Sequence, residues 1–131
     1  VERNPEGIEL IKANAANFAV FNIHPVQGEA PAALAGLPEA DVIIIGGSGG
    51  NLQTILELSD TLLRSEGRIV ITAVTIETLY EAMKIMEHMG NYQVEATGIQ
   101  VTRLRTLGNR HMFDALNPIY IITCNKGRML C

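Results

Sequence analysis

The sequence predicts an α/β fold: an open, mainly parallel sheet with helices on both faces and an antiparallel pair of strands at one edge. Residues 42–45 and 68–74 are continuous β-branched and apolar runs, the pattern of strands that are buried on both faces of a parallel sheet. Segments of about 10–15 residues with apolar residues at helical spacing lie between such runs, as in strand–helix–strand units. No helix separates the last two strands, so we expect them to pair antiparallel.

The first predicted helix covers residues 5–17. Asn4 can cap it, and Pro5 suits the first helical position, where the backbone N–H would have no partner. The apolar face of this helix consists of Ile8, Ile11, Ala15 and Phe18. A short β-like run, residues 19–24, follows it, and residues 28–40 contain a turn and a short helix.

The middle of the chain continues from strand 42–45 through a glycine turn into a second helix. The apolar positions of that helix are Leu52, Ile55, Leu56, Leu62 and Leu63. Gly67 ends it before strand 68–74, and Thr75 can cap a third helix that ends at Gly90. The apolar face of the third helix consists of Ile76, Leu79, Met83 and Met86.

The last third of the chain is rich in β-type sequence. Residues 92–104 are predicted to form one long strand, a polar loop follows, and residues 118–124 form the last strand. These two strands are the predicted antiparallel pair at the sheet edge.

Composition excludes several classes of protein. The chain has 131 residues, enough for one domain, and 47% of them are hydrophobic, enough for a real core. A net charge of −4 argues against nucleic-acid binding, which normally requires a basic face. The two cysteines, Cys124 and Cys131, form neither a metal-binding pattern nor a disulfide framework. No run approaches the roughly 18 apolar residues that span a membrane and no signal peptide is visible, so we expect a cytoplasmic protein.

The glycine turn after residues 42–45 is the first candidate site. It reads Gly46, Gly47, Ser48, Gly49 and Gly50, which fits the G-x-S-x-G pattern of serine hydrolases. That hypothesis needs a later acid and then a histidine, and Glu95 and His111 stand in the required order. However, the hydrolase fold normally has more strands than this chain offers, and a motif made mostly of glycine arises easily by chance.

A second hypothesis treats the glycines as a ledge without side chains. Neither a phosphate loop nor a dinucleotide fingerprint fits, because no Gly-Lys-Ser/Thr follows and the required later glycine is replaced by Asn51 or Leu52. Ligands of open α/β sheets bind at the carboxyl ends of the strands, where this turn is expected. Glu2 and Glu29 also follow predicted strands, and a carboxylate there can accept hydrogen bonds from a ribose diol. A tight turn without a ligand is the alternative.

A basic stretch lies near the C-terminal end. Residues 98–111 contain Arg103, Arg105, Arg110 and His111 and no acid. Arginine pairs bidentately with carboxylates, so a polycarboxylate ligand or an acidic partner subunit is one interpretation. A charged, solvent-facing strand that resists aggregation is the other.

Five stretches together resemble a known family. They are "VERNPEG", "GEAPAAL", "ADVIIIGGSGGNLQTIL", "GRIVITAVTIETLYEAM" and "NPIYIITC". The sequence is similar over essentially all 131 residues to the decarboxylating precorrin C15-methyltransferases of cobalamin biosynthesis, which occur alone or as the C-terminal half of precorrin-6Y C5,15-methyltransferases. The double glycine with its following helix is fairly specific to that family.

The resemblance implies a class I S-adenosylmethionine-dependent methyltransferase, a Rossmann-like sheet with an antiparallel edge strand. Residues 1–131 would be a single domain fragment, from the end of the family's second strand to its last. The implied activity is methyl transfer from S-adenosyl-L-methionine to C15 of a precorrin, with decarboxylation of the acetate chain at C12. The implied assembly is a homo-oligomer, a tetramer, and the composition adds the expectation of no nucleic-acid or membrane partner.

The same resemblance assigns roles to residues. Glu2 matches the acid that holds the cofactor ribose, and Glu29 and Ala30 match residues beside the adenine. The glycine turn matches the loop that faces both sulfonium and tetrapyrrole, so the cofactor contact is Gly46, and the substrate contacts are Gly47, Ser48, Gly49, Gly50, Arg103 and Arg105. The resemblance implies no metal site. Methyl transfer to an electron-rich carbon needs positioning more than a general base, so the sequence requires no such group, and Tyr80 and His111 are candidates for it.

One departure from the family pattern changes the expectation for this chain. The family's first strand and its glycine-rich cofactor loop lie upstream of the acid matched by Glu2, and they are absent from this sequence. We therefore expect this chain alone not to be a competent enzyme. A methyltransferase of the same fold with another small substrate, and a non-catalytic structural or assembly fragment, remain as alternatives.

Overall fold

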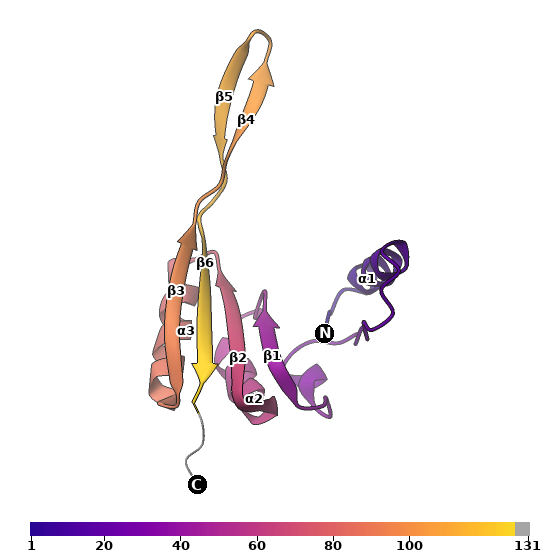
Figure 1. Cartoon of the computed structure of the whole chain (residues 1–131), viewed down its shortest axis with the longest axis vertical. Helices are drawn as coiled ribbons and strands as arrows, with labels where there is room; N and C mark the ends of the chain where they lie inside the picture. Colours follow the sequence, from indigo (N-terminus) through magenta and orange to yellow (C-terminus); the bar gives the residue numbers. More distant parts are fainter. Residues whose placement is uncertain (128–131) are drawn as a thin grey trace. The chain divides into compact units, whose positions relative to one another are not determined.

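The computed structural model describes residues 1–127, which form two compact units divided between Pro38 and Glu39 (Figure 1). Cys131, one of the two cysteines considered above, lies outside the described residues. The two units are described separately below.

The first unit contains one helix, α1, Pro5–Asn17, as predicted. The Asn4 side chain caps it by accepting a hydrogen bond from the backbone N–H of Glu6 at 2.9 Å. At the other end, the N–H groups of Ala19 and Val20 donate to the carbonyls of Ala16 and Ala15, and Ala19 has a φ of 51°. This closing turn usually contains glycine at the left-handed position, so Ala19 adopts it at a cost of roughly 1 kcal/mol. The short helix predicted within 28–40 is the 3-10 turn η1, Ala32–Leu34.

The strand predicted at residues 19–24 is wrong. This segment has no strand structure, and the unit contains only an isolated parallel bridge between Glu2 and Gln27. Aromatic side chains at its start stay in solvent, since Phe18 is 78% and Phe21 88% exposed. A β-like sequence becomes a strand only where a neighbouring strand accepts its backbone hydrogen bonds, and no strand within residues 1–127 pairs with this segment.

The second unit is built on a four-stranded sheet with the order β1-β2-β6-β3. Its strands are β1 Ala40–Ile45, β2 Leu63–Ala73, β3 Tyr92–Ile99 and β6 Ile119–Lys126. β1 and β2 are parallel, whereas β6 runs antiparallel to both β2 and β3. The predicted antiparallel pair is confirmed, with β3 as its outer strand.

Two helices, α2 Leu52–Leu62 and α3 Ile76–Met89, cover one face of this sheet and lie behind the strands in Figure 1. Within residues 39–127 no helix covers the other face and only β1 and β2 pair in parallel, so the predictions of helices on both faces and of a mainly parallel sheet are wrong for this unit. Thr75 caps α3 through the backbone N–H of Thr78, and Gly90 ends it with a φ of 73°, as predicted. The largest fully buried apolar side chains are Leu52, Leu56, Ile69, Ile71, Met86, Ile122 and Cys124. Strand residues in this group alternate along β2 and β6, so a single face of the sheet meets the helices.

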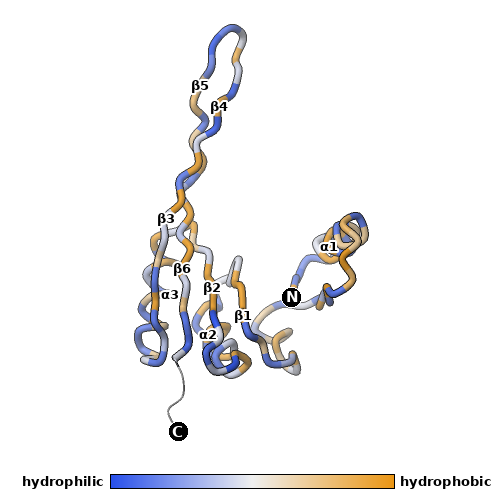
Figure 2. The backbone as a smooth tube through the Cα atoms, in the orientation of Figure 1, coloured by the Kyte–Doolittle hydropathy of each residue, from blue (hydrophilic) through white to orange (hydrophobic). Residues whose placement is uncertain are grey.

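The prediction that strand 42–45 is buried on both faces is wrong. Figure 2 shows β1 as a strongly hydrophobic strand, yet Val42 is 54% and Ile44 72% exposed. The reason is that α2 and α3 cover only the face to which Ile45 belongs, and β1 is an outer strand of the sheet. The predicted apolar face of α3 is wrong at one position, because Ile76 is 80% exposed at the start of the helix.

The long strand predicted at 92–104 is divided, and the polar loop after it is a hairpin. After β3 ends, β4 Thr102–Leu107 pairs antiparallel with β5 Arg110–Ala115 as a separate two-stranded sheet. Gly108, with a φ of 61°, and Asn109 form the two-residue turn. Figure 1 shows this hairpin continuing beyond the end of β3 and β6, and every residue of both strands is exposed.

A polar cluster around Asp60 ties the end of α2 to β3 and β6. The Asp60 Oδ1 accepts a hydrogen bond from the Tyr92 hydroxyl at 2.5 Å and pairs with Lys126 Nζ at 2.8 Å. Lys126 Nζ also donates to the carbonyls of Asp60 and Leu63. Burial alone would raise the pKa of Asp60, but the Lys126 and Tyr92 hydrogen bonds outweigh it and hold that pKa below its ordinary value. Burial and the Asp60 carboxylate raise the pKa of Tyr92.

We expect Asp60→Asn to lower the free energy of unfolding by about 1–3 kcal/mol at neutral pH, because Lys126 then loses its carboxylate. A carboxyl group whose pKa is lower in the folded state stabilises the fold above its unfolded pKa of about 3.9. That stabilisation disappears as the pH falls through the folded pKa. Urea unfolding at neutral and acidic pH should therefore show a difference between parent and variant that shrinks on acidification.

The control for this experiment is Glu9→Gln. Glu9 pairs with Lys12 at 2.9 Å, but both side chains are exposed, so this change should cost no more than about 0.5 kcal/mol. Equal losses for the two variants, or a difference that does not depend on pH, would contradict the structural role of Asp60.

Candidate functional site

The carboxyl end of β1 leads directly into the glycine turn. Because β1 and β2 are parallel, with Ile45 paired to Ile71, their carboxyl ends meet at one edge of the sheet. The glycine turn leaves β1 at this edge and leads to α2. The predicted position of the turn is confirmed.

The four glycines of the turn have two different physical roles. A Cβ built on Gly46 or Gly47 would have no atom within 4 Å, and neither residue has a positive φ. Gly49 and Gly50 instead have φ values of 57° and 87°, a region that other residues adopt only with strain. Gly49 and Gly50 thus make the turn possible, whereas the fold itself does not require glycine at 46 or 47. We call Gly46 and Gly47 the ledge.

Hydrogen bonds to backbone carbonyls hold the two ends of the turn, weakly at its start and with ordinary length at its end. The Thr72 hydroxyl lies 3.5 Å from the carbonyl oxygens of both Ile45 and Gly46, at the limit of hydrogen bonding. The Asn51 N–H donates to the Ser48 carbonyl at 2.9 Å. The turn is therefore held through its backbone, and the ledge remains open.

The residues of the serine-hydrolase hypothesis are not assembled. Glu95 lies on β3, separated from β1 by β2 and β6, which at about 4.8 Å per strand is roughly 14 Å across the sheet. His111 lies on β5 beside the hairpin turn. No hydrogen bond among the described residues joins either side chain to Ser48. The geometry does not support a nucleophilic role for Ser48.

The acids expected near the cofactor belong to the first unit. The Glu2 carboxylate accepts a hydrogen bond from the Asn4 N–H at 2.7 Å, and the backbone of Glu2 bonds to Val26 and Gly28. Glu29 pairs with Arg3 at 3.4 Å, and both side chains are largely exposed. The bridge between Glu2 and Gln27 thus brings Glu2 close in structure to the segment that leads to Glu29 and Ala30. Both carboxylates keep oxygen atoms open to further donors.

The hairpin carries its arginines on one face and the pair of Leu104 and Phe113 on the other. Residues opposite each other in an antiparallel pair share a face, and faces alternate along each strand. The arginine face contains Arg103, Arg105, Leu107, Arg110, Met112 and Asp114. The apolar face contains Thr102, Leu104, Thr106, His111, Phe113 and Ala115.

This alternation corrects the basic patch predicted from the sequence. The three arginines share one face, but His111 lies on the other. None of the ion pairs within residues 1–127 involves the hairpin arginines, so their guanidinium groups are open to an external carboxylate. Leu104 and Phe113, cross-strand partners on the apolar face, are 67% and 80% exposed.

Tyr80 and Cys124, the other titratable residues considered, have surroundings that do not indicate a catalytic role. Tyr80 is 65% exposed on α3, with Lys84 Nζ 5.8 Å from its ring centre. Burial raises the pKa of the Cys124 thiol to about 11, so this cysteine is an inert core residue. Within residues 1–127, no three or more His, Cys, Asp or Glu side chains are grouped to hold a metal ion. In that same part of the chain, no helix combines the length and apolar character needed to cross a membrane.

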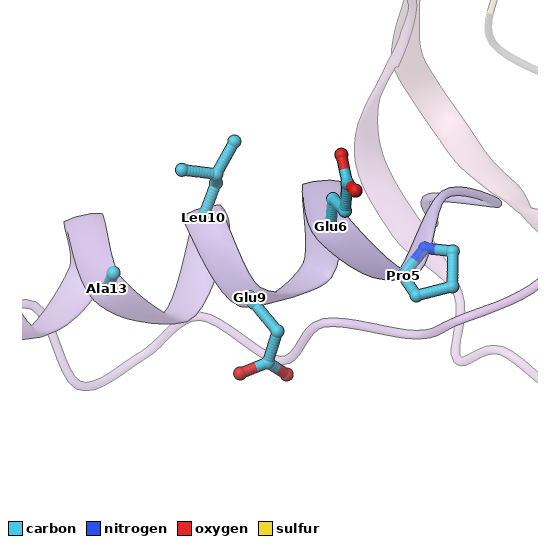
Figure 3. Close-up of a pocket in the computed structure, with 5 residues that line it drawn as sticks. All are labelled: Pro5, Glu6, Glu9, Leu10 and Ala13. Carbon is cyan, nitrogen blue, oxygen red and sulfur yellow. The ribbon is translucent and has the colours of Figure 1, made fainter.

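A shallow depression along α1 offers no alternative site. Its lining residues are Pro5, Glu6, Glu9, Leu10 and Ala13. Figure 3 shows the carboxylates of Glu6 and Glu9 pointing in opposite directions, so they do not converge on a ligand.

Exposed apolar residues at the sheet edge were missed by the sequence reasoning. Val74, directly after β2, is 69% exposed, and Ile76 follows it at 80%. Ile119 and Ile99, paired where β6 begins and β3 ends, are 41% and 43% exposed. Their positions in the sequence could have indicated them, because each is an apolar residue within a few positions of a strand end, where a polar turn residue is usual.

Residues 1–126 match the family model described as a precorrin methyltransferase domain. The chain is 35% identical over 126 residues to a cobalt-precorrin-6B C(15)-methyltransferase (decarboxylating) of Salmonella typhimurium, covering 96% of this chain and 65% of that protein. A probable enzyme of the same name from Methanothermobacter thermautotrophicus is 36% identical, over 93% of this chain and 64% of its own length. The chain thus spans slightly less than two thirds of these relatives.

Solved structures of precorrin methyltransferases are also similar to this chain. A precorrin-6y C5,15-methyltransferase from Geobacter metallireducens superposes with a TM-score of 0.85 at 41% identity, over 95% of this chain and 65% of that one. An S-adenosylmethionine-dependent O-methyltransferase from Thermotoga maritima shares only the fold, with a TM-score of 0.74 at 11% identity. The fold is that of the class I S-adenosylmethionine-dependent methyltransferases, which confirms the predicted fold class.

The two roles of the glycines can be separated by stability measurements. We expect Gly50→Ala to lower the free energy of unfolding by about 1 kcal/mol, because alanine is strained at a φ of 87°. Gly47→Ala should leave the free energy of unfolding unchanged or raise it by up to about 1 kcal/mol. The added Cβ enters open space in the folded protein, and alanine reduces the conformational freedom of the unfolded chain. Urea titration of both variants tests this, and a loss at Gly47 as large as at Gly50 would show that the ledge is a structural requirement.

Proposed function

The chain belongs to the precorrin methyltransferase domain family, and from this premise we propose that the protein methylates a precorrin. The reaction is methyl transfer from S-adenosyl-L-methionine to C15, with loss of the carboxyl group of the acetate chain at C12. The name of the Salmonella relative, a decarboxylating C(15)-methyltransferase, supports this choice over a methyltransferase with another small substrate.

The observation that carries the proposal is the open ledge. Gly46 and Gly47 stand at the carboxyl end of a parallel strand, where α/β sheets bind ligands, and nothing in the fold explains the absence of side chains there. A flat ring can approach such a backbone closely. This favours a ligand over the alternatives of an empty turn and a purely structural fragment.

The residues at hand suit S-adenosylmethionine. When bound, it supplies a methyl group already activated on a sulfonium. Glu2 keeps one carboxylate oxygen for a ribose hydroxyl while the other accepts from Asn4, and Glu29 and Ala30 are proposed to lie beside the adenine. Gly46 is proposed to face the sulfonium, where a backbone carbonyl tolerates positive charge.

The proposed substrate contacts are the rest of the glycine turn and the hairpin arginines. Gly47, Ser48, Gly49 and Gly50 present backbone to the ring, and Arg103 and Arg105 share the face that can pair with its carboxylates. Catalysis then depends on holding the acceptor carbon in line with the methyl group. Tyr80 and His111 remain candidates for a proton-transfer group.

We also propose a homo-oligomer, a tetramer, formed through the apolar face of the hairpin. Leu104 and Phe113 place two large apolar side chains in water on a two-stranded sheet that has no other layer. A two-stranded hairpin by itself is marginally stable, and packing between copies would bury this face.

The function is tested in a polypeptide that spans the full length of the relatives. We expect Gly47→Val to reduce methyl transfer to a precorrin on the order of 10²-fold, because its side chain displaces the ring from the ledge. Ser48→Ala should stay within a few-fold of the parent, since Ser48 contributes backbone contacts. Transfer of radiolabel from S-adenosylmethionine measures both, and full activity of Gly47→Val would refute the role of the ledge.

The assembly is tested by light scattering on the chain. We expect Phe113→Glu to lower the molar mass of the main species, because it places a charge in the apolar contact. Met112→Glu is the matched control, since Met112 is adjacent, 50% exposed and on the arginine face. A mass that stays unchanged in Phe113→Glu, or falls equally in both variants, would exclude the apolar face as the contact.

A further inference from the structure

Four exposed apolar residues stand where β2 and β3 end, where β6 begins and where α3 begins. They are Val74, Ile76, Ile99 and Ile119, and we call them the apolar bed. β1 and β2 are neighbours, so the residues after β2 stand next to the ledge. Ala73 pairs with Tyr120 and Ile99 with Ile119, which continues the bed across β6 to β3.

Strand alternation places Ile99 and Ile119 on one face. Ile119 precedes Tyr120, which is on the same face of β6 as the buried Ile122, so Ile119 lies opposite to the face that α2 and α3 bury. Ile99 shares that face because it pairs directly with Ile119. Val74 stands directly after the last residue of β2, and Ile76 begins α3. From the ledge to Ile99 the sheet edge spans four neighbouring strands, roughly 14 Å at about 4.8 Å per strand. That width suits a macrocycle of several rings better than a single small ring.

The hairpin with its arginine face follows β3 and precedes β6 along the chain, so it is attached at the same sheet edge as the bed. Arg103 lies four positions beyond Ile99, roughly 13 Å along an extended strand. The Leu116 N–H donates to the Val101 carbonyl at 2.9 Å, so the pairing of the two chains persists between sheet and hairpin. An apolar surface with guanidinium groups at one end matches a ligand that is apolar at its centre and carries carboxylates at its margin.

We propose that the apolar bed holds the ring face of a carboxylated tetrapyrrole, with its carboxylate arms directed toward Arg103 and Arg105. This inference rests on the proposed function and adds to it the residues that select a large planar substrate. The exposed apolar side chains exclude water from the ring, and the arginines set which edge of it points toward the hairpin. The bed thereby decides which ring carbon reaches the ledge.

The test uses the whole chain and uroporphyrin, a planar tetrapyrrole with carboxylate side chains whose visible absorption reports binding directly. We expect Ile76→Glu to weaken uroporphyrin binding roughly tenfold or more, because it removes apolar contact and adds a like charge. Leu58→Glu is the matched control: Leu58 is 37% exposed on α2, away from the bed, and should bind as the parent does.

The arginine end has its own pair of variants. Arg105→Gln should weaken binding several-fold, and the effect should shrink at high salt, because it depends on charge. Arg64→Gln is the control, since Arg64 already pairs with Asp41 at 3.1 Å within the protein. Binding unchanged in Ile76→Glu or in Arg105→Gln would overturn the proposal.

Porphyrin binding and the KM for precorrin separate the proposed role of the bed from the proposed methyltransferase function. Uroporphyrin binding needs no S-adenosylmethionine, so a chain that binds the porphyrin with the expected variant pattern supports the bed even if methyl transfer fails. Conversely, an active full-length protein whose KM for precorrin is unchanged by Ile76→Glu would overturn the bed and leave the function intact. If Ile76→Glu changes the molar mass but not porphyrin affinity, the bed is a contact between copies and the proposal is wrong.

Discussion

The insertion of β6 between β2 and β3 is the constraint on which the second unit depends. Ile122 pairs with Ile71 on one side and with Ala96 on the other, so one strand completes both ladders. Its buried side chains, Ile122 and Cys124, meet the layer formed by α2 and α3. Because β6 runs against β2, its first residues lie beside the last residues of β2. The ledge, the apolar bed and the base of the hairpin therefore share one edge of the sheet.

The separation of structural and functional glycines follows from the same edge. Gly49 and Gly50 turn the chain from β1 into α2 and need left-handed backbone, which is a property of the fold. Gly46 and Gly47 have ordinary backbone and free space around them, which the fold alone does not explain. Ser48 lies between these pairs and would be the nucleophile of the serine-hydrolase pattern. The structure does not place Glu95 or His111 beside it. A sequence pattern alone could not separate these roles, because it contains neither φ angles nor distances.

Much of the fold was predictable because the signals were local. Asn4 and Thr75 cap their helices through their own side chains, and Gly90 ends α3 in the expected conformation. The hairpin was missed although Gly108-Asn109 is a two-residue turn signal, because the long run before it was interpreted as one continuous strand. The strand expected at residues 19–24 does not form, because a β-like sequence needs a neighbouring strand and none of the strands in the described part of the chain pairs with it.

The sequence by itself determined the helices, most strand positions, the glycine turn and the family resemblance, since each depends on residues close together in the chain. Only the tertiary structure decided which residues share a face. The register of β4 and β5 placed three arginines together and moved His111 to the other side, because a shift of one residue exchanges the two faces of a strand. Likewise, only the strand order brought Val74, Ile99 and Ile119 to one edge of the sheet with the ledge, because pairing between distant segments is set by the packing of the whole sheet.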